Sequence, residues 1–424
     1  MNFNTTKNSD IGEELIFGVH ESGLKVYCIP SRFEKKYAAL AVNYGSVDSV
    51  FDTPEGEHIA VPDGIAHFLE HKLFEKSDGT NAFDDYAKTG ASANAYTSFN
   101  LTSYLFTCVN NFSENLDILC SMVANPYFTD ENVAKEQGII GQEIKMYEDD
   151  VNWEVFFNLL QALYVNHPVR KDIAGDIDSI SKIDKEIIYK CYGAFYVPSN
   201  MVLFISGNVS VDEAAEIADK YFPAAKSSLR PPLRNFVDEP KGVFKDFMEK
   251  KLSVSAPVFA LGFKDNEPSV DAQALLRKDI VTNTLLEILF GKSSAVYSKL
   301  YSEGLINSTF YTDYTMESDY AFAMLGGESE NYQKVVDVCL KAADNFKFKE
   351  SDFTAAKNLL IGRFLRMFNS VEHISNTFVS NVFRRLDIFS YLDVCRSISI
   401  REVKDRAEYL FSGGNTAVSV VNPI

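Results

Sequence analysis

Long hydrophobic runs are missing from this 424-residue chain. No stretch approaches the roughly 20 apolar residues that a membrane-spanning helix needs. Residues 1–16 are polar and acidic, without the basic segment and apolar run of a signal peptide. The six cysteines are scattered and include no Cys-x-x-Cys pair, which favours reduced, buried thiols over a disulfide framework. We therefore expect a cytoplasmic protein with no membrane partner.

Positive charge is scarce as well. Lys and Arg total 41 against 59 Asp and Glu, which gives a formal net charge of −18. Nucleic-acid binding depends on neutralising phosphates, and anionic membrane surfaces attract basic segments, so this balance disfavours both partners. Hydrophobic residues make up 46% of the chain, enough for ordinary buried cores. The length suggests two domains or more.

Histidine is rare too, yet two of the six histidines form a motif. His67 and His71 lie four residues apart, with Glu70 between them. On a helix, residues at i, i+3 and i+4 share one face, so two imidazoles and a carboxylate converge. Neutral imidazoles bind Zn²⁺ well, and a carboxylate left off the metal can accept a proton from a metal-bound water. This His-x-x-Glu-His order is the inverzincin signature.

The alternative is a surface helix whose histidines have this spacing by accident. The flanking residues Ile65, Phe68, Leu69 and Leu73 are apolar, however. They predict a largely buried helix whose polar face needs a partner. The metal hypothesis therefore accounts for both the motif and its surroundings.

A catalytic zinc needs a third protein ligand and an open position. The best candidates lie on a helix that we expect from Thr129 to about Tyr147, with acidic residues in its first turn. Glu136 and Glu143 are seven residues apart on it and so share a face. Spacing alone does not choose between them, and either glutamate can instead be a solvated surface charge.

The second half of the chain repeats the first. Both halves align without gaps at an offset of 216, which predicts an α+β fold of two repeated domains, each a mainly antiparallel sheet with helices packed on one face. The first, metal-binding domain spans 1–225, a proline-containing linker spans 226–245, and the second domain spans 246–424. The aligned identities are Leu73-Phe74 with Leu289-Phe290, Lys76-Ser77 with Lys292-Ser293, Tyr104 with Tyr320, Phe106 with Phe322, and Ser113-Glu114-Asn115 with Ser329-Glu330-Asn331.

Residue patterning places the main elements of both halves. At the 216 offset, the two histidines and Glu70 become Asn283, Glu287 and Leu286, so we expect the second domain to hold no metal. The expected strands are 24–30, 38–44, 94–99, 103–109, 201–206, 258–263, 320–325 and 417–421, and the expected helices are 82–89, 129–147, 185–195, 211–221, 272–290, 332–344 and 352–368.

The motif and its spacing resemble the pitrilysin/insulinase family of zinc metallopeptidases, which includes the mitochondrial processing peptidase and insulin-degrading enzyme. The segment His67-Phe68-Leu69-Glu70-His71 is followed by Glu143, 72 residues after residue 71. The resemblance continues through Gly90-Ala91-Ser92-Ala93-Asn94-Ala95-Tyr96-Thr97 and Tyr196-Val197-Pro198-Ser199-Asn200-Met201. The length is similar to that of the short two-domain bacterial members.

This resemblance implies a zinc-dependent endopeptidase that acts on extended peptides or small unfolded proteins. It implies that His67, His71 and Glu143 bind Zn²⁺ and that Glu70 is the general base. Glu136 matches the family's additional acidic residue, which takes part in catalysis from behind the metal ligands.

The resemblance also bears on the substrate and on partners. Asn94 and Ala95 match an edge strand that pairs with the substrate backbone. Catalytic members carry an arginine and a tyrosine in the second domain, and the matching positions here are Tyr301 and Asn307. We therefore expect a related subunit to supply this pair in a heterodimer; otherwise the chain forms a homodimer. Two further alternatives are a non-catalytic peptide-binding or scaffold subunit and a structural zinc site.

Overall fold

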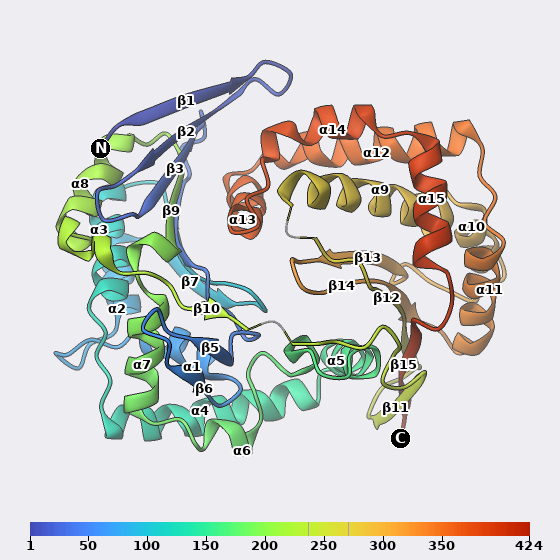
Figure 1. The fold of residues 1–424 in the computed structure, drawn as a ribbon, viewed down its shortest axis with the longest axis horizontal. Coiled ribbons are helices and arrows are strands. Elements are labelled where there is room, and N and C mark those ends of the chain that lie inside the picture. Colours follow the sequence, from blue (N-terminus) through green and yellow to red (C-terminus); the bar gives the residue numbers. More distant parts are fainter. Residues whose placement is uncertain (236, 270) are drawn as a thin grey trace. The chain divides into compact units, whose positions relative to one another are not determined.

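The computed structural model describes residues 1–235, 237–269 and 271–424, which fold into two compact units (Figure 1). Unit 1 comprises Met1–Ile144, Asp172–Asn235 and Met367–Phe383. Unit 2 comprises Lys145–Lys171, the described residues of 236–366, and Arg384–Ile424. Each unit thus includes a segment from the other half of the chain. The predicted domain boundaries, 1–225 and 246–424, stay a prediction. Position 236, in the predicted linker, lies outside the described residues.

Unit 1 is built on a seven-stranded sheet with the order β1-β2-β3-β9-β4-β8-β7. Strands β3 and β9 pair in parallel and the other neighbours are antiparallel. The central β9 reads Met-Val-Leu-Phe-Ile-Ser-Gly and is buried throughout, as expected for a strand covered on both faces. The strands are β1 (Phe3–Asn8), β2 (Glu13–Val19), β3 (Lys25–Pro30), β4 (Lys36–Val42), β7 (Ser92–Thr97), β8 (Thr102–Cys108) and β9 (Met201–Gly207), and a small sheet holds β5 (Val50–Asp52), β6 (His58–Ala60) and β10 (Leu233–Arg234).

Helices cover this sheet and carry the candidate site. Helix α1 lies between the small sheet and β7 in the chain, and α4 follows α3. The helices of unit 1 are α1 (Ile65–Lys72), α2 (Ala82–Thr89), α3 (Phe112–Ala124), the greater part of α4 (Asp130–Glu148), α6 (Ile177–Ile180), α7 (Lys185–Phe195), α8 (Val211–Tyr221) and α13 (Val371–Val382).

Unit 2 repeats the core of this topology. Its sheet order, β11-β15-β12-β14-β13, matches β3-β9-β4-β8-β7 of unit 1, including the parallel pair. The α+β fold class and the repeat are therefore confirmed. Its elements are β11 (Phe247–Leu252), β12 (Val258–Asp265), β13 (Tyr311–Met316), β14 (Ala321–Glu328) and β15 (Thr416–Pro423), with α5 (Val151–Leu163), α9 (Ala272–Phe290), α10 (Ala295–Ser302), α11 (Tyr332–Asp344), α12 (Glu350–Met367), α14 (Tyr391–Ser397) and α15 (Ile400–Leu410).

The offset between corresponding elements is 220 rather than 216 for several of them. Helix α3 begins at residue 112 and α11 at residue 332, and α5 and α13 begin at residues 151 and 371. The offset of 216 is wrong for α3, because it would pair the buried Asn115 with Asn331, which precedes α11. A shift of four residues is about one turn of a helix or two side-chain repeats of a strand. Each residue therefore stays on the same face of its element, and the pattern of apolar and polar residues is similar at offsets of 216 and 220.

Each sheet is also covered by a helix from the other half of the chain. Helix α5 packs on β11, β12 and β15. At Gly262 of β12, a Cβ atom would lie 2.9 Å from methyl carbons of Leu159 and Leu163, so only glycine lets α5 approach this closely. Phe259 and Leu261, on the alternate positions of β12, pack into the core formed with α9 and α11. Helix α13 packs in the same way on β4 and β9 of unit 1.

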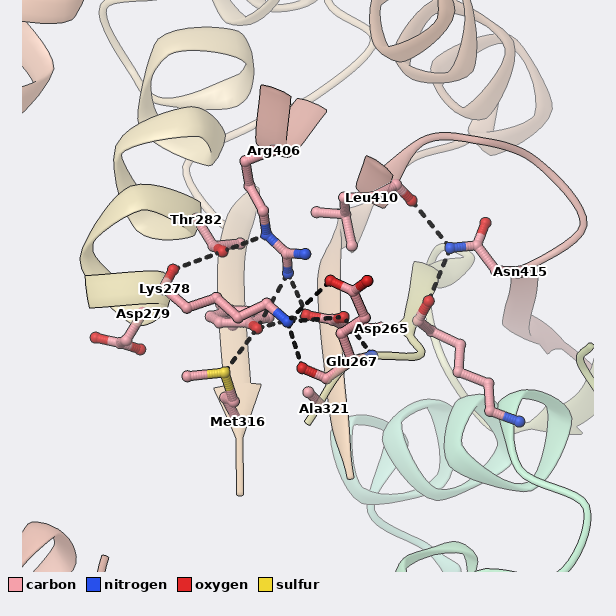
Figure 2. A network of polar contacts seen from close by, with 12 residues as sticks. Asp265, Glu267, Lys278, Asp279, Thr282, Met316, Ala321, Arg406, Leu410 and Asn415 are labelled. Carbon is pink, nitrogen blue, oxygen red and sulfur yellow. Dashed lines mark hydrogen bonds and ion pairs between the residues drawn. The ribbon is translucent and has the colours of Figure 1, made fainter. Parts of the chain in front are cut away.

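A buried polar network anchors α9 in unit 2 (Figure 2). The Arg406 guanidinium points toward α9 and β12, donating from Nε to Thr282 Oγ1 (2.8 Å) and from Nη2 to Asp265 Oδ2. The Lys278 ammonium lies 3.6 Å from the other Asp265 oxygen. Burial opposes ionisation of Asp265, but Arg406 and Lys278 hold the pKa of its carboxyl below the usual value. In the described residues, no helix is long and apolar enough to cross a membrane.

Candidate metal centre

Helix α1 places His67, Glu70 and His71 on a buried segment of unit 1. The helix is preceded by Gly64, whose φ of 86° is readily adopted only by glycine. A Cβ atom on Gly64 would lie 2.3 Å from the carbonyl oxygen of Ala174, so the start of α1 is fixed against the loop at residue 174. The chain here needs a residue without a side chain, which explains the Asp-Gly sequence before the motif.

Helix α4 supplies the two candidate glutamates. Its first turn is stabilised by a reciprocal pair of hydrogen bonds, in which the Asn132 N–H donates to Thr129 Oγ1 (3.1 Å) and the Thr129 N–H donates to Asn132 Oδ1 (2.9 Å). Glu136 is buried in the α4 face that also buries Ile140. Glu143, seven residues later, lies on the same face.

The two histidines and Glu143 converge on one point. His67 Nε2 lies 3.7 Å from Glu143 Oε1, and His71 Nε2 lies 3.5 Å from Glu143 Oε2. One ligand atom from each residue falls within 4.8 Å of the others, and no second cluster of this kind occurs in the part of the chain that the structure describes. The predicted residues His67, His71 and Glu143 are therefore together, on α1 and α4.

Glu136 contacts the opposite side of His71. Its Oε1 lies 3.1 Å from His71 Nδ1, which leaves His71 Nε2 facing Glu143. Burial opposes the charge on Glu136, but the hydrogen bond to His71 and the charge of Lys72 hold the pKa of the carboxyl below its usual value. Burial also opposes protonation of His71, yet the hydrogen bond to Glu136 and the charges of Glu70 and Glu143 raise the pKa of the imidazole.

Glu70 is held apart from the converging atoms. Its Oε2 accepts a hydrogen bond of 2.6 Å from Thr97 Oγ1 on β7. Burial raises the pKa of Glu70 to about 7, although the Thr97 bond and the charge of His71 lower it. A carboxyl with a pKa near neutrality can both accept and return a proton at neutral pH.

His67 has the properties of a neutral ligand. Burial and the neighbouring His71 lower the pKa of His67 to about 4. Its buried Nδ1 has no hydrogen-bond partner among the residues that the structure describes, while Nε2 faces Glu143. A neutral imidazole is the form that binds Zn²⁺.

The donor set as a whole fits zinc. Two imidazole nitrogens and one carboxylate are the ligands of a zinc with an open fourth position, and no cysteine is required. Three carboxylates, those of Glu70, Glu136 and Glu143, surround the two imidazoles, and Lys72 contacts that of Glu136. A divalent cation would balance this negative charge.

Strand β7, which carries Asn94 and Ala95, lies at one edge of the seven-stranded sheet. The Ser98 N–H donates to the Leu101 carbonyl (2.8 Å), and hydrogen-bonded pairs alternate along an antiparallel ladder. Ala95, opposite Tyr104, is therefore in a non-hydrogen-bonded pair, and its N–H and C=O point away from β8. The Ala95 N–H donates a hydrogen bond to the side-chain oxygen of the exposed Asn94 (2.9 Å).

Two residues of the centre escape sequence reasoning. The contact of Thr97 with Glu70 depends on the packing of β7 beside α1, and the spacing of the two residues in the sequence does not indicate it. Lys72 directly follows His71, but a lysine on a helix is usually a surface residue, and its complete burial is a property of the fold. Two of the other histidines are buried and have structural partners: His167 Nε2 lies 3.1 Å from Asp319 Oδ2, and His20 Nε2 lies 2.8 Å from Asp219 Oδ1.

Comparisons with known proteins bear on both halves. A family model described as Insulinase (Peptidase family M16) matches residues 56–177, and one described as Peptidase M16 inactive domain matches residues 182–360. YmfH of Bacillus subtilis (strain 168), named an uncharacterized zinc protease, is 41% identical over 412 residues and the match covers 95% of each chain. PqqE of Helicobacter pylori, named a zinc protease, is 24% identical over 352 residues, covering 80% of this chain and 75% of that one.

Solved structures share the fold. A crystal structure described as an M16-like peptidase from Alicyclobacillus acidocaldarius matches with a TM-score of 0.90 and 31% identity, covering 100% of this chain and 99% of the other. A protease structure from Helicobacter pylori matches with a TM-score of 0.80 and 18% identity, over 96% of this chain and 99% of the other. The second of these likenesses concerns the fold alone.

Proposed function

Because this chain belongs to the insulinase family, peptidase family M16, we propose that it is a zinc-dependent peptidase that hydrolyses bonds in extended peptides. The observation that carries the proposal is the convergence of His67 Nε2, His71 Nε2 and the Glu143 carboxylate within 4.8 Å, with Glu70 held aside by Thr97. This arrangement supplies three metal ligands and one carboxylate that is free for proton transfer.

The zinc would be held by His67, His71 and Glu143. When bound, it supplies Lewis-acid chemistry that polarises a peptide carbonyl and makes water more acidic. Glu136 orients His71 by accepting from Nδ1, so that Nε2 is presented to the metal. We propose Glu143 rather than Glu136 as the third metal ligand because Glu136 already contacts the other side of the His71 imidazole.

Glu70 is the residue that moves the proton. Its carboxylate accepts the proton of the attacking water and then delivers that proton to the amine of the departing peptide. Thr97 donates to Oε2 and so fixes one oxygen, which leaves Oε1 as the atom that exchanges the proton. The apolar neighbours Phe68 and Leu69 are fully buried and keep α1 from shifting.

The substrate would bind as an added strand. The N–H and C=O of Ala95 point away from β8, at the edge of the sheet, and can pair with an extended peptide. The Asn94 side chain, which accepts from the Ala95 N–H at 2.9 Å, would give up this bond when a peptide carbonyl takes its place. Thr97, on the same strand, ties this edge to Glu70, so the peptide would run past the base.

The experiment that tests this proposal is Glu70→Gln. The substitution removes the base and keeps the ligands, so hydrolysis of a quenched-fluorescence peptide library should fall by about 10²–10⁴-fold, the scale of general acid–base catalysis. Zinc content should be unchanged. Glu131→Gln, at the start of α4, is the matched control and should retain full activity. Near-normal hydrolysis by Glu70→Gln would show that the base is another group, and a wild-type chain that binds peptides without cleaving them would favour a peptide-binding subunit.

We further propose that a related chain completes the active enzyme. The positions that match the family's arginine and tyrosine are Tyr301 and Asn307. Tyr301 is 56% exposed, and the Asn307 side-chain amide donates to Glu328 Oε2 (2.9 Å). The sequence contains no arginine between Arg277 and Arg363. Positioned donors stabilise the negative charge that develops on the substrate carbonyl, and these two residues do not supply a guanidinium.

The test of this partnership is a reconstitution. The chain alone should bind zinc but hydrolyse peptides slowly. A related chain that lacks the metal motif and keeps the arginine and tyrosine should raise the rate by about 10²-fold or more, the scale of one lost oxyanion donor. The same relative with its arginine changed to alanine is the control. Full activity of this chain as a monomer or homodimer, unaffected by any relative, would contradict the partnership but not the peptidase proposal.

A further inference from the structure

Lys72 places a fully buried ammonium group between α1 and α4. The residue directly follows His71, and its side chain has 0% exposure. An ammonium group has three N–H donors, and three acceptors surround this one. They are Glu75 Oε2 at 2.7 Å, the Asn132 carbonyl at 3.2 Å and Glu136 Oε2 at 3.5 Å. A buried charge is tolerated only when it is paired and hydrogen-bonded, so this geometry holds the ammonium in one place.

Glu136 lies between this ammonium and a candidate metal ligand. Its Oε2 faces Lys72, and its Oε1 lies 3.1 Å from His71 Nδ1. The two oxygens therefore have different partners on the same helix, and the carboxylate cannot rotate without losing one of them. With Oε1 fixed, His71 carries its proton on Nδ1 and presents Nε2 toward Glu143.

We propose that Lys72 is a positioning residue of the metal centre, which acts through Glu136 to set the tautomer and orientation of His71. This inference rests on the proposed function, because it takes His67, His71 and Glu143 as the zinc ligands. Without the ammonium, Glu136 Oε2 would be a buried oxygen without its cation, and the carboxylate would turn away from His71 Nδ1. Loss of such an outer partner lowers metal affinity by about 10–100-fold.

Glu75 offers a change with the opposite expected sign. The ammonium lies closer to Glu75 (2.7 Å) than to Glu136 (3.5 Å), so the two carboxylates compete for it. Glu75→Gln weakens the competitor and leaves the ammonium to Glu136. Zinc affinity should therefore be unchanged or higher in Glu75→Gln and lower in Lys72→Met, although both substitutions remove one charge from the same ion pair.

The experiment is a double-mutant cycle on zinc affinity, measured by competition with a chromophoric chelator on the full-length chain. It compares wild type, Lys72→Met, Glu136→Gln and the double variant. Lys72→Met should weaken zinc binding by about 10–100-fold in the wild-type background and should have little further effect in the Glu136→Gln background. A lysine that only stabilises the packing of α1 would weaken binding by the same factor in both backgrounds, which would overturn the proposal.

Two controls keep the result interpretable. Lys76→Met removes a nearby lysine that pairs with Asp85 (2.8 Å), and it should leave zinc affinity unchanged. If Lys72→Met does not fold, Lys72→Gln, which keeps a donor and loses the charge, takes its place in the cycle. Unchanged zinc affinity in the Lys72 variant overturns this inference alone. A wild-type chain that binds no zinc overturns the proposed function together with it.

Discussion

Helices α1 and α4 of unit 1 and helices α9 and α12 of unit 2 occupy equivalent places in two copies of one fold, but their charges are balanced differently. In unit 1 the Glu143 carboxylate faces two imidazole nitrogens at 3.7 and 3.5 Å. In unit 2 the buried Glu287 carboxylate lies 3.0 Å from the Arg363 guanidinium. Glu143 and Arg363 are each the fourteenth residue of their helix, and His71 and Glu287 each lie in a last turn.

This difference explains why we propose a metal centre for the first half of the chain and not for the second. In the second half, the Arg363 guanidinium is the cation of this place. The first half has a carboxylate and two imidazoles there, which a bound metal cation would bring together. The residue that corresponds to Glu136, the seventh of α12, is Ala356, so the copy also lacks the group that orients a histidine. The match of residues 182–360 to a domain described as inactive agrees with this reading.

The strongest way to break the comparison is to rebuild the metal site in the copy. The triple substitution Asn283→His, Glu287→His and Arg363→Glu restores the ligand types on α9 and α12. Zinc content, measured by atomic absorption, should rise from one to two ions per chain, with the new ion held more weakly because Ala356 cannot orient a histidine. Asn283→His alone is the control and should stay at one ion. A folded triple variant that still binds one ion would show that the two helix pairs are not equivalent.

A smaller effect should follow from removing the internal cation. Arg363→Ala leaves Glu287, which is only 5% exposed, without its guanidinium partner. Because the Arg363 side chain is 59% exposed and solvent screens the pair, the loss should be about 1 kcal/mol, measured by urea unfolding. Zinc affinity should not change. Arg366→Ala, at another exposed position of α12, is the control, and equal destabilisation by both would argue against a role for the ion pair.

The elements that hold the site were predictable because their signals are local. The spacing of His67 and His71 and the apolar residues around them predict a buried helix, and the acidic first turn predicts the start of α4. Strand β7 was predicted two residues late, from 94 instead of Ser92. The Gly-Ala-Ser sequence before it gives no clear start signal, and boundaries are the least certain part of such predictions.

The parts that sequence did not predict depend on distant contacts. Strand β1 is mostly polar and exposed, and most residues of β2 are half-buried, so the pairing of these strands leaves no strong alternation in the sequence. The position of helix α5 on the sheet of unit 2 depends on the gap that Gly262 leaves for Leu159 and Leu163. The burial of Lys72 depends on Glu75, Glu136 and Asn132 meeting around it, which no spacing rule reveals.

The most direct test of the central claim, a single zinc held in the first half by His67, His71 and Glu143, is the zinc content of three purified chains after dialysis. Wild type should hold one zinc ion per chain. His67→Ala should hold none, because it removes a metal ligand, and Asn283→Ala, its counterpart in the copy, should still hold one. Stoichiometric zinc in His67→Ala, or its loss in Asn283→Ala, would contradict the account.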